Sequence, residues 1–450
     1  IASSLAGGDL TGDGMNDLII GANNVNITGH RTGAVFIVAG PLIESASNLS
    51  STATTIISGT NSGGQTGDEL AVSDVNGDWN DDLLIASPEV SVSGIGTEVG
   101  HVTLFYGPIE GDTDTLEADV TFEGTAVGAH LGRGLAGGGD LDGDGLPDIV
   151  LAAPKLSEHT ATAGAIYVFG GDSSLDASFY SADDRDAKVY STSPDMQFGD
   201  SLTFIGDANG DGRDDLLIGA PGGRAHGQKT GAAYLMLGHA TNFSSGTAML
   251  HTSMDAWYDG AGERDGAGTA ITGLGDVDDD GYAEFAIGAP KNDTEASNGG
   301  AVYIMLDPPV AGGAHDLTST ADVRYYGSEE ENRIGGSLTG NIDLDNDSVL
   351  DMIIGAPNVN YEGNPSRGKS FLFYGPIPDM SDGTLSSEPT DEDGAFVGLG
   401  IRDFAGQTLL GGYDWTNDGI TDLALAATGN NGMEGEGNAG AVYVFFGRGM

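Results

Sequence analysis

Short runs of apolar residues, separated by polar and glycine-rich segments, recur along the whole chain. One kind of run, such as residues 149–153, directly follows an aspartate-rich loop, and a second kind, such as residues 164–169, opens with glycine. A third kind alternates apolar and polar residues, as in 120–123, before a glycine-rich stretch leads into the next loop. Runs of β-branched and aromatic residues predict strands, and alternation predicts a strand with one solvated face.

Each repeating unit therefore predicts four short antiparallel strands, with the aspartate-rich loop joining the first strand to the second. No segment of useful length shows helical periodicity. Four-stranded sheets repeated radially form a β-propeller, which removes most exposed sheet edges by closing a ring. A linear solenoid is the alternative, but it needs distinctive capping units, and the sequence shows none.

We therefore predict an all-β fold, a seven-bladed β-propeller of four-stranded antiparallel blades that forms a single domain over residues 1–450. The predicted blades are approximately residues 1–58, 59–124, 125–191, 192–260, 261–327, 328–398 and 399–450. The last predicted blade contains signals for three strands only, ending near residues 441–445. We expect its fourth strand to come from residues upstream of Ile1, which leaves 441–445 as an apolar edge.

The aspartate-rich loops share a nine-residue pattern with ligand-type side chains at positions one, three, five and nine. Consecutive loops begin 65 to 71 residues apart, as from Asp9 to Asp74 and from Asp343 to Asp414. Position one is Asp9, Asp74, Asp140, Asp207, Asp276, Asp343 and Asp414, and position three is Thr11, Asn76, Asp142, Asn209, Asp278, Asp345 and Thr416. Position five is Asp13, Asp78, Asp144, Asp211, Asp280, Asp347 and Asp418, and position nine is Asp17, Asp82, Asp148, Asp215, Glu284, Asp351 and Asp422.

This pattern predicts a calcium site in every loop, and up to seven Ca²⁺ ions in all. Oxygen side chains at alternate positions of a tight loop can converge on one point, and Ca²⁺ takes about six to eight oxygen ligands. Without a cation the clustered carboxylates would repel one another, and Mg²⁺ better suits octahedral, water-rich sites. We expect the calcium to be structural, because enzymes rarely need the same centre in every repeat.

Two loops depart from the pattern at position six, where glycine is usual. Trp79 occupies this position in the second loop and Ser348 in the sixth. A side chain there must tolerate or avoid a positive φ angle. We expect these two calcium sites to be weaker or distorted.

Composition and charge exclude several functional classes. The chain carries a formal charge of −52, with 16 Lys and Arg against 68 Asp and Glu, so a nucleic-acid interface is not expected. The chain contains no Cys, so no disulfide is expected. It also contains no apolar run of about 18 residues, so no membrane insertion is expected. Seven bound Ca²⁺ ions would neutralise up to 14 of the negative charges. The remaining acidity is typical of a surface adapted to high salt.

The motifs resemble FG-GAP repeats. The FG part stands as Phe198-Gly199, the GAP part is intact at 219–221, 288–290 and 355–357, and the aspartate-rich loop lies between them. The chain is similar over essentially its whole length to the seven-bladed propeller head of integrin α subunits. A calcium loop in all seven units is typical of prokaryotic, calcium-rich members of the family. The resemblance implies an extracellular or cell-surface location and a ligand-binding face opposite the metal loops.

The few basic residues also indicate that opposite face. Many lie in connections between the second and third strands, and we take these as candidate ligand-binding residues: Arg31, Lys155, Arg224, Lys229, Lys291, Arg367 and Lys369. Arg133, Arg264, Arg333 and Arg402 lie close to the connections between blades. Local ion pairing with loop acids is the competing interpretation.

The leading functional hypothesis is a non-enzymatic extracellular adhesion or ligand-recognition module that binds a protein or a glycan and is rigidified by calcium. The alternative is a propeller domain of, or accessory to, a polysaccharide- or phosphodiester-cleaving enzyme. A purely structural surface protein is the third possibility. No catalytic residues are predicted, because Ser201 in the sequence Gly199-Asp200-Ser201-Leu202 has no matching His and Asp partners.

Overall fold

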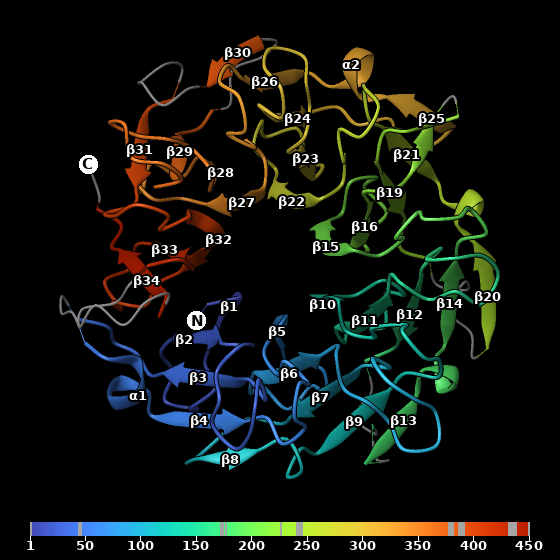
Figure 1. The fold of residues 1–450 in the computed structure, drawn as a ribbon, viewed down its shortest axis with the longest axis vertical. Coiled ribbons are helices and arrows are strands. Elements are labelled where there is room, and N and C mark those ends of the chain that lie inside the picture. Colours follow the sequence, from blue (N-terminus) through green and yellow to red (C-terminus); the bar gives the residue numbers. More distant parts are fainter. Residues whose placement is uncertain are drawn as a thin grey trace. The chain divides into compact units, whose positions relative to one another are not determined.

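The computed structural model confirms an all-β seven-bladed propeller with a few short helices (Figure 1). The structure describes residues 2–43, 47–171, 175, 178–225, 227–239, 246–376, 382–385, 392–430 and 439–448. The chain forms two compact units. The first unit comprises residues 1–202, 238–251 and 413–419, and the second comprises residues 203–237, 252–412 and 420–450. Among the described helices, none is long and apolar enough to cross a membrane.

The first three blades lie within the first unit. Blade one contains β1 (Ser4–Gly8), β2 (Asp17–Gly21), β3 (Ala34–Val38) and β4 (Thr55–Ser58), with helix α1 (Leu49–Thr52) before β4. Blade two contains β5 (Leu70–Ser73), β6 (Asp82–Ser87), β7 (His101–Phe105) and β9 (Val120–Glu123), with β8 (Thr113–Asp114) before β9. Blade three contains β10 (Gly134–Gly139), β11 (Asp148–Ala153), β12 (Ala165–Phe169) and β14 (Ala187–Tyr190), with β13 (Phe179–Ser181) and η1 (Ala182–Asp184) before β14.

Blades four and five follow the same order. Blade four contains β15 (Ser201–Gly206), β16 (Asp215–Ala220), β19 (Ala232–Met236) and β21 (Ala256–Asp259). Its connections carry the hairpin β17 (Arg224–Ala225) and β18 (Gln228–Lys229), then β20 (Thr247–Leu250) and η2 (His251–Ser253). Blade five contains β22 (Ala270–Gly275), β23 (Glu284–Ala289), β24 (Ala301–Met305) and β26 (Val323–Gly327), with β25 (Gly313–Asp316) and α2 (Leu317–Thr320) before β26.

Blade six contains β27 (Ser337–Ile342), β28 (Asp351–Ala356), β29 (Lys369–Phe373) and β31 (Gly394–Val397), with β30 (Asp382–Leu385) before β31. In blade seven the described residues form three strands, β32 (Ala405–Tyr413), β33 (Asp422–Ala427) and β34 (Ala441–Phe445). The three strands agree with the strand signals in the sequence. The source of a fourth strand stays a prediction.

The four main strands of a blade pair antiparallel, in chain order. In blade three, Ile149 of β11 faces Phe169 of β12, and Val150 faces Val168. Every residue of β11 is buried, because this strand has a neighbouring strand on each side and a packed layer on each face. Such burial explains why the second strands read as unbroken apolar runs rather than as alternating ones.

The sequence did not predict a fifth strand at the outer edge of five blades. This strand comes from the connection before the last strand of the following blade, and it pairs parallel with the fourth strand. The pairs are β4 with β8, β9 with β13, β14 with β20, β21 with β25, and β26 with β30. Each pair covers an edge that would otherwise be open and ties one blade to the next by backbone hydrogen bonds.

Candidate metal centres

Each aspartate-rich loop is folded around the carboxylate at its first position. In the third loop, Asp140 Oδ1 accepts the backbone N–H groups of Gly143 at 2.7 Å and Asp144 at 3.1 Å, and its Oδ2 accepts that of Gly145 at 2.8 Å. In all seven loops the position-one carboxylate accepts the N–H groups of positions five and six. These bonds fold each loop tightly around the side chain at position one.

The acid at position nine is the first residue of the second strand and is buried in every loop. Asp148 is 1% exposed and opens β11, where its Oδ2 accepts the N–H of Leu141 at 2.8 Å and its Oδ1 that of Gly171 at 3.0 Å. The other six position-nine acids are also fully or almost fully buried: Asp17, Asp82, Asp215, Glu284, Asp351 and Asp422. This acid therefore joins the loop to the end of the third strand.

Positions four and six of the loops adopt left-handed backbone. In the third loop Gly143 has φ of 78° and Gly145 of 93°. At position six, Trp79 has φ of 72° and Ser348 has φ of 69°, so both residues keep the glycine conformation despite their side chains. The second and sixth loops therefore retain the shape of the others, and their non-glycine residues at position six adopt a strained backbone conformation.

Three loops bring acidic oxygens especially close together. One oxygen from each member lies within 4.8 Å of the others in three groups: Asp276, Asp278, Asp280 and Glu284; Asp140, Asp142 and Asp148; and Asp343, Asp345 and Asp347. These three loops are the ones that carry four acids in the sequence. A donor set made only of oxygen atoms fits a hard cation such as Ca²⁺.

The buried acids show the electrostatic cost of the loops without a cation. Burial raises the pKa of Asp148 and of Asp82 to about 7, and that of Glu284 to about 8, and nearby loop carboxylates add to each shift. A bound divalent cation removes this cost, because it favours the charged form of each carboxylate.

The structure also shows a buried contact on the opposite side of the blades that the sequence analysis missed. Asn292 Nδ2 donates to Asp265 Oδ2 at 2.6 Å, and both residues are about 2% exposed. The same contact joins Asn430 to Asp403 at 3.1 Å. In the sequence, Asn292 and Asn430 occupy the same place relative to the position-nine acids Glu284 and Asp422. These pairs fix the loops on which the candidate ligand face is built.

The candidate ligand-face cations differ widely in their surroundings. Arg31, Arg224 and Lys291 are exposed, whereas Lys369 is 2% exposed and its Nζ lies 2.6 Å from Glu392 Oε1. Arg367 pairs with Glu362 at 3.2 Å. Lys369 is thus unable to reach a ligand without breaking a buried ion pair.

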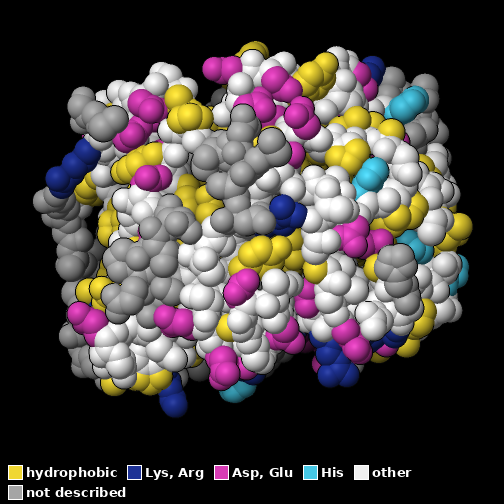
Figure 2. Space-filling view, turned by 90° about the horizontal axis from the view of Figure 1, so that it is seen from above, with side chains coloured by type: hydrophobic (Ala, Val, Ile, Leu, Met, Phe, Trp, Pro, Cys, Tyr) yellow, Lys and Arg dark blue, Asp and Glu magenta, His cyan; other side chains and the backbone are white. Residues whose placement is uncertain are grey.

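Four cations of the second unit gather around one connection, which we call the basic patch: Arg224, Lys229, Arg264 and Lys291. Arg224 faces Lys229 across the β17–β18 hairpin, and the N–H of Arg264 donates to the carbonyl of Lys229. The N–H of Lys291 donates to the carbonyl of Asp265, the neighbour of Arg264. On the side of the molecule that Figure 2 shows, acidic side chains recur while basic ones are few, in keeping with 16 Lys and Arg against 68 Asp and Glu in the chain.

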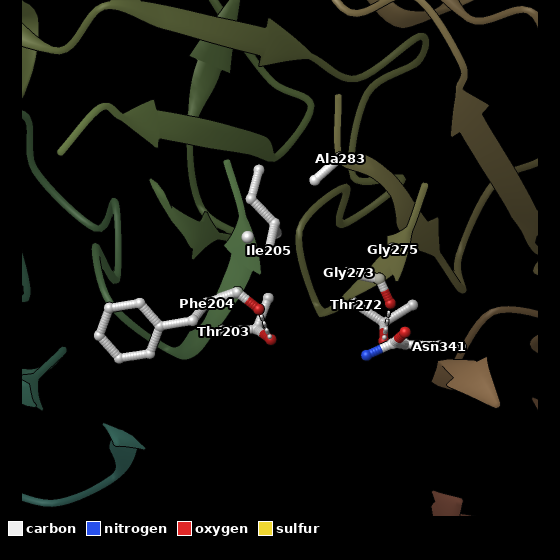
Figure 3. A pocket seen from close by; sticks show the side chains of 10 residues that line it. Thr203, Phe204, Ile205, Thr272, Gly273, Gly275, Ala283 and Asn341 are labelled. Carbon is white, nitrogen blue, oxygen red and sulfur yellow. Dashed lines mark hydrogen bonds between the residues drawn. The ribbon is translucent and has the colours of Figure 1, made fainter. Parts of the chain in front are cut away.

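A pocket of about 330 Å³ in the second unit bears on the enzyme alternative (Figure 3). Its lining comes from the first strands of blades four, five and six and includes Thr203, Phe204, Thr272 and Asn341. The hydroxyls of Thr203 and Thr272 donate to nearby backbone carbonyls at 3.1 Å. Apart from these two hydroxyls, the described residues of the lining contribute no carboxylate, imidazole, amine or thiol.

Comparison with known proteins agrees with the motifs. The FG-GAP repeat family matches residues 2–38, 131–169, 198–236 and 267–305, and each match spans the first three main strands of a blade and its acidic loop. The chain therefore contains four FG-GAP repeats, and they lie in four blades of its β-propeller.

Its relatives include integrin α subunits. Integrin alpha-5 of Xenopus laevis is 30% identical over 243 residues, which is 52% of this chain and 20% of that protein. Phosphatidylinositol-glycan-specific phospholipase D of Rattus norvegicus is 31% identical over 224 residues, which is 48% of this chain and 26% of that protein. A crystal structure of BBS1N in complex with ARL6DN, soaked with lead, has a TM-score of 0.51 at 9% identity and covers 99% of this chain and 93% of that one. This likeness concerns the fold alone.

Proposed function

We propose that this protein is a calcium-stabilised, non-enzymatic adhesion or ligand-recognition propeller that acts at the cell surface or outside the cell. The observation that carries the proposal is the repetition of one acidic loop, with a buried position-nine acid, in all seven blades. A centre repeated in every blade suits architecture better than catalysis. Integrin α relatives support a recognition role for the scaffold.

Calcium is the natural occupant of the loops. The donors are carboxylate, amide and hydroxyl oxygens, and extracellular calcium is abundant enough to fill sites of modest affinity. A metal that binds only the folded state stabilises it by mass action. Removal of calcium should therefore lower the melting temperature.

The test is thermal unfolding with EGTA, with millimolar Ca²⁺ and with millimolar Mg²⁺, at constant ionic strength. We expect a large rise in melting temperature with Ca²⁺ and a much smaller one with Mg²⁺. Native mass spectrometry should count up to seven Ca²⁺ ions. An unchanged melting temperature after EGTA treatment would contradict a structural role for calcium.

The proposed ligand, a protein or a glycan, binds the face opposite the metal loops. The basic patch of Arg224, Lys229, Arg264 and Lys291 supports this, because it concentrates positive charge on a chain of net charge −52. Such a local field attracts an anionic partner and raises its association rate. We therefore expect acidic glycans or acidic protein segments among the ligands.

An array of sulfated and carboxylated glycans and of extracellular matrix proteins, probed in millimolar Ca²⁺, tests this interface. Arg224→Glu should weaken binding, and the effect should shrink at high salt. Arg448→Glu is the matched control, because Arg448 is exposed and its N–H donates to Leu344 in the sixth metal loop. Equal effects of the two variants would place the interface elsewhere.

The enzyme alternative is a propeller that is part of, or accessory to, a polysaccharide- or phosphodiester-cleaving enzyme. The match to phosphatidylinositol-glycan-specific phospholipase D favours it, although the aligned region is 26% of that protein. Hydrolysis of bis(p-nitrophenyl) phosphate and of acidic polysaccharides by the purified chain tests it directly. Turnover that survives in calcium and disappears on heat denaturation would support the enzyme over the recognition module.

A further inference from the structure

A group of possible metal ligands lies far from the aspartate-rich loops, in the first unit. Glu89 follows β6 and Glu98 precedes β7, so both lie in the connection between the second and third main strands of blade two. His130 lies just before β10, the first strand of blade three. Since β6 starts at its metal loop and β10 runs towards its own, these three residues sit at the opposite ends of the strands.

The three side chains lie close together. One nitrogen of His130 and one carboxylate oxygen from each of Glu89 and Glu98 lie within 4.8 Å of one another. Glu89 Oε1 is 3.2 Å from His130 Nδ1, and Glu98 Oε2 is 3.5 Å from its Nε2. His130 thus has a carboxylate at each ring nitrogen.

The hydrogen bonding of His130 is incomplete. The residue is 4% exposed, and its Nδ1 is fully buried without a hydrogen bond to any described residue, although Glu89 Oε1 lies 3.2 Å away. A neutral imidazole has one N–H and one lone pair, so it can satisfy an acceptor at one nitrogen only. A buried polar atom left without a partner is costly.

We propose that Glu89, Glu98 and His130 bind a divalent transition-metal ion of the zinc class, separately from the calcium loops. The mixed set of one imidazole and two carboxylates suits Zn²⁺, Co²⁺ or Mn²⁺, whereas Ca²⁺ prefers oxygen ligands alone. Three protein ligands leave further coordination positions for water or for a group from a bound ligand.

One basic side chain lies close to the imidazole of His130. Lys155 Nζ lies 3.4 Å from His130 Nε2, so a metal ion that binds this nitrogen must displace the ammonium of Lys155. Lys155 is only partly buried, so its ammonium can move to solvent when a cation binds.

Competition by Lys155 separates this site from a simple ion-paired cluster. Lys155→Met removes the ammonium and should tighten metal binding. If the acids merely balance the charge of Lys155, the same change leaves two carboxylates that attract any divalent cation, Ca²⁺ included. Tighter Co²⁺ binding that excess Ca²⁺ does not reverse supports the site, and unchanged, weaker or Ca²⁺-reversed binding opposes it.

The experiment titrates the full chain with Co²⁺ in millimolar Ca²⁺, which keeps the aspartate-rich loops filled. The readouts are visible Co²⁺ absorption and calorimetric stoichiometry, with Zn²⁺ displacement as a check. The wild-type protein should show one Co²⁺ site that Zn²⁺ displaces and that further Ca²⁺ does not.

His130→Asn should remove this site, and Glu98→Gln should weaken it. Asn is chosen because His130 has φ of 55°, a conformation that Asn tolerates well. His101→Asn is the matched control, since His101 contacts the single carboxylate of Glu123 at 3.1 Å. Equal Co²⁺ binding by the wild type and His130→Asn, both folded by circular dichroism, would overturn the proposal.

Discussion

The backbone N–H of Trp79 donates to Oδ2 of Asp74 across 2.8 Å, and Trp79 holds φ at 72° to make this bond. Gly145 makes the equivalent bond to Asp140 at 2.8 Å in the third loop. The second loop therefore keeps the shape of the others although a bulky residue occupies its glycine position. Because Trp79 is 95% exposed, packing does not compensate for the strain.

Trp79→Gly should stabilise the protein. The left-handed conformation costs a non-glycine residue roughly 1–2 kcal/mol, so we expect a gain of about 1 kcal/mol, measured by chemical denaturation in Ca²⁺. Trp79→Ala is the control, because it removes the indole but keeps the Cβ atom that causes the strain. A similar gain in both variants would show that the exposed indole, and not the backbone, is responsible.

The calcium sites should rank by the number of acids that they contain. Asp144→Ala acts in a loop with four acids, and Asp78→Ala in a loop where position three is the neutral Asn76. Both carboxylates accept the N–H of position seven at 2.9 Å, and Asp78 also accepts the side-chain amides of Asn76 and Asn80, so its replacement removes more local hydrogen bonds. We expect Asp144→Ala to remove one Ca²⁺ and to lower the melting temperature more than Asp78→Ala. Native mass spectrometry measures the bound Ca²⁺, and calorimetry measures the melting temperature. Equal losses of both in the two variants would contradict a ranking of the sites by their number of acids.

The buried ion pair of Lys369 and Glu392 should affect the stability of the protein because each charge neutralises the other. Their side chains are 2% and 3% exposed, and Nζ lies 2.6 Å from Oε1. Glu392→Gln leaves a buried ammonium without its counter-charge and should cost about 3–5 kcal/mol. The double variant Lys369→Met/Glu392→Gln should recover much of that loss in urea unfolding. If the double variant is as unstable as the single one, Glu392 stabilises the protein by some means other than neutralising Lys369.

Glu69 should make stability fall as the pH rises. Burial raises its pKa from 4.5 to about 8, Asp68 adds to the shift, and Arg133 opposes it. The folded state therefore holds a proton that the unfolded state releases near pH 4.5, and this contribution to stability is lost as the pH passes through about 8.

Glu69→Gln removes this dependence at that residue. We expect its melting temperature relative to the wild type to rise progressively between pH 5 and about pH 8, in saturating Ca²⁺. Glu117→Gln serves as the control, because Glu117 is exposed and the change removes a carboxylate of the same kind. A difference that stays constant across this range would mean that Glu69 titrates normally.

The sequence alone determined the repeat number, the order of the main strands and the position of every acidic loop. These features are local: each strand and loop is encoded within one stretch of chain, and seven copies reinforce the same pattern. Comparison of the second loop with its repeats also indicated that Trp79 must tolerate or avoid a positive φ angle, and the structure shows that it adopts one.

The tertiary structure decided what depends on residues distant along the chain. The parallel outer strands, such as β25 on β21, are short and without a clear period, and only the neighbouring blade gives them a partner. Lys369 looked like an exposed loop cation, yet β29 begins at this residue and Glu392 meets it in the blade. His130 joins Glu89 and Glu98 only because adjacent blades bring two connections together. Composition and spacing record local preferences, whereas burial and the pairing of charges are set by the packing of one blade on the next.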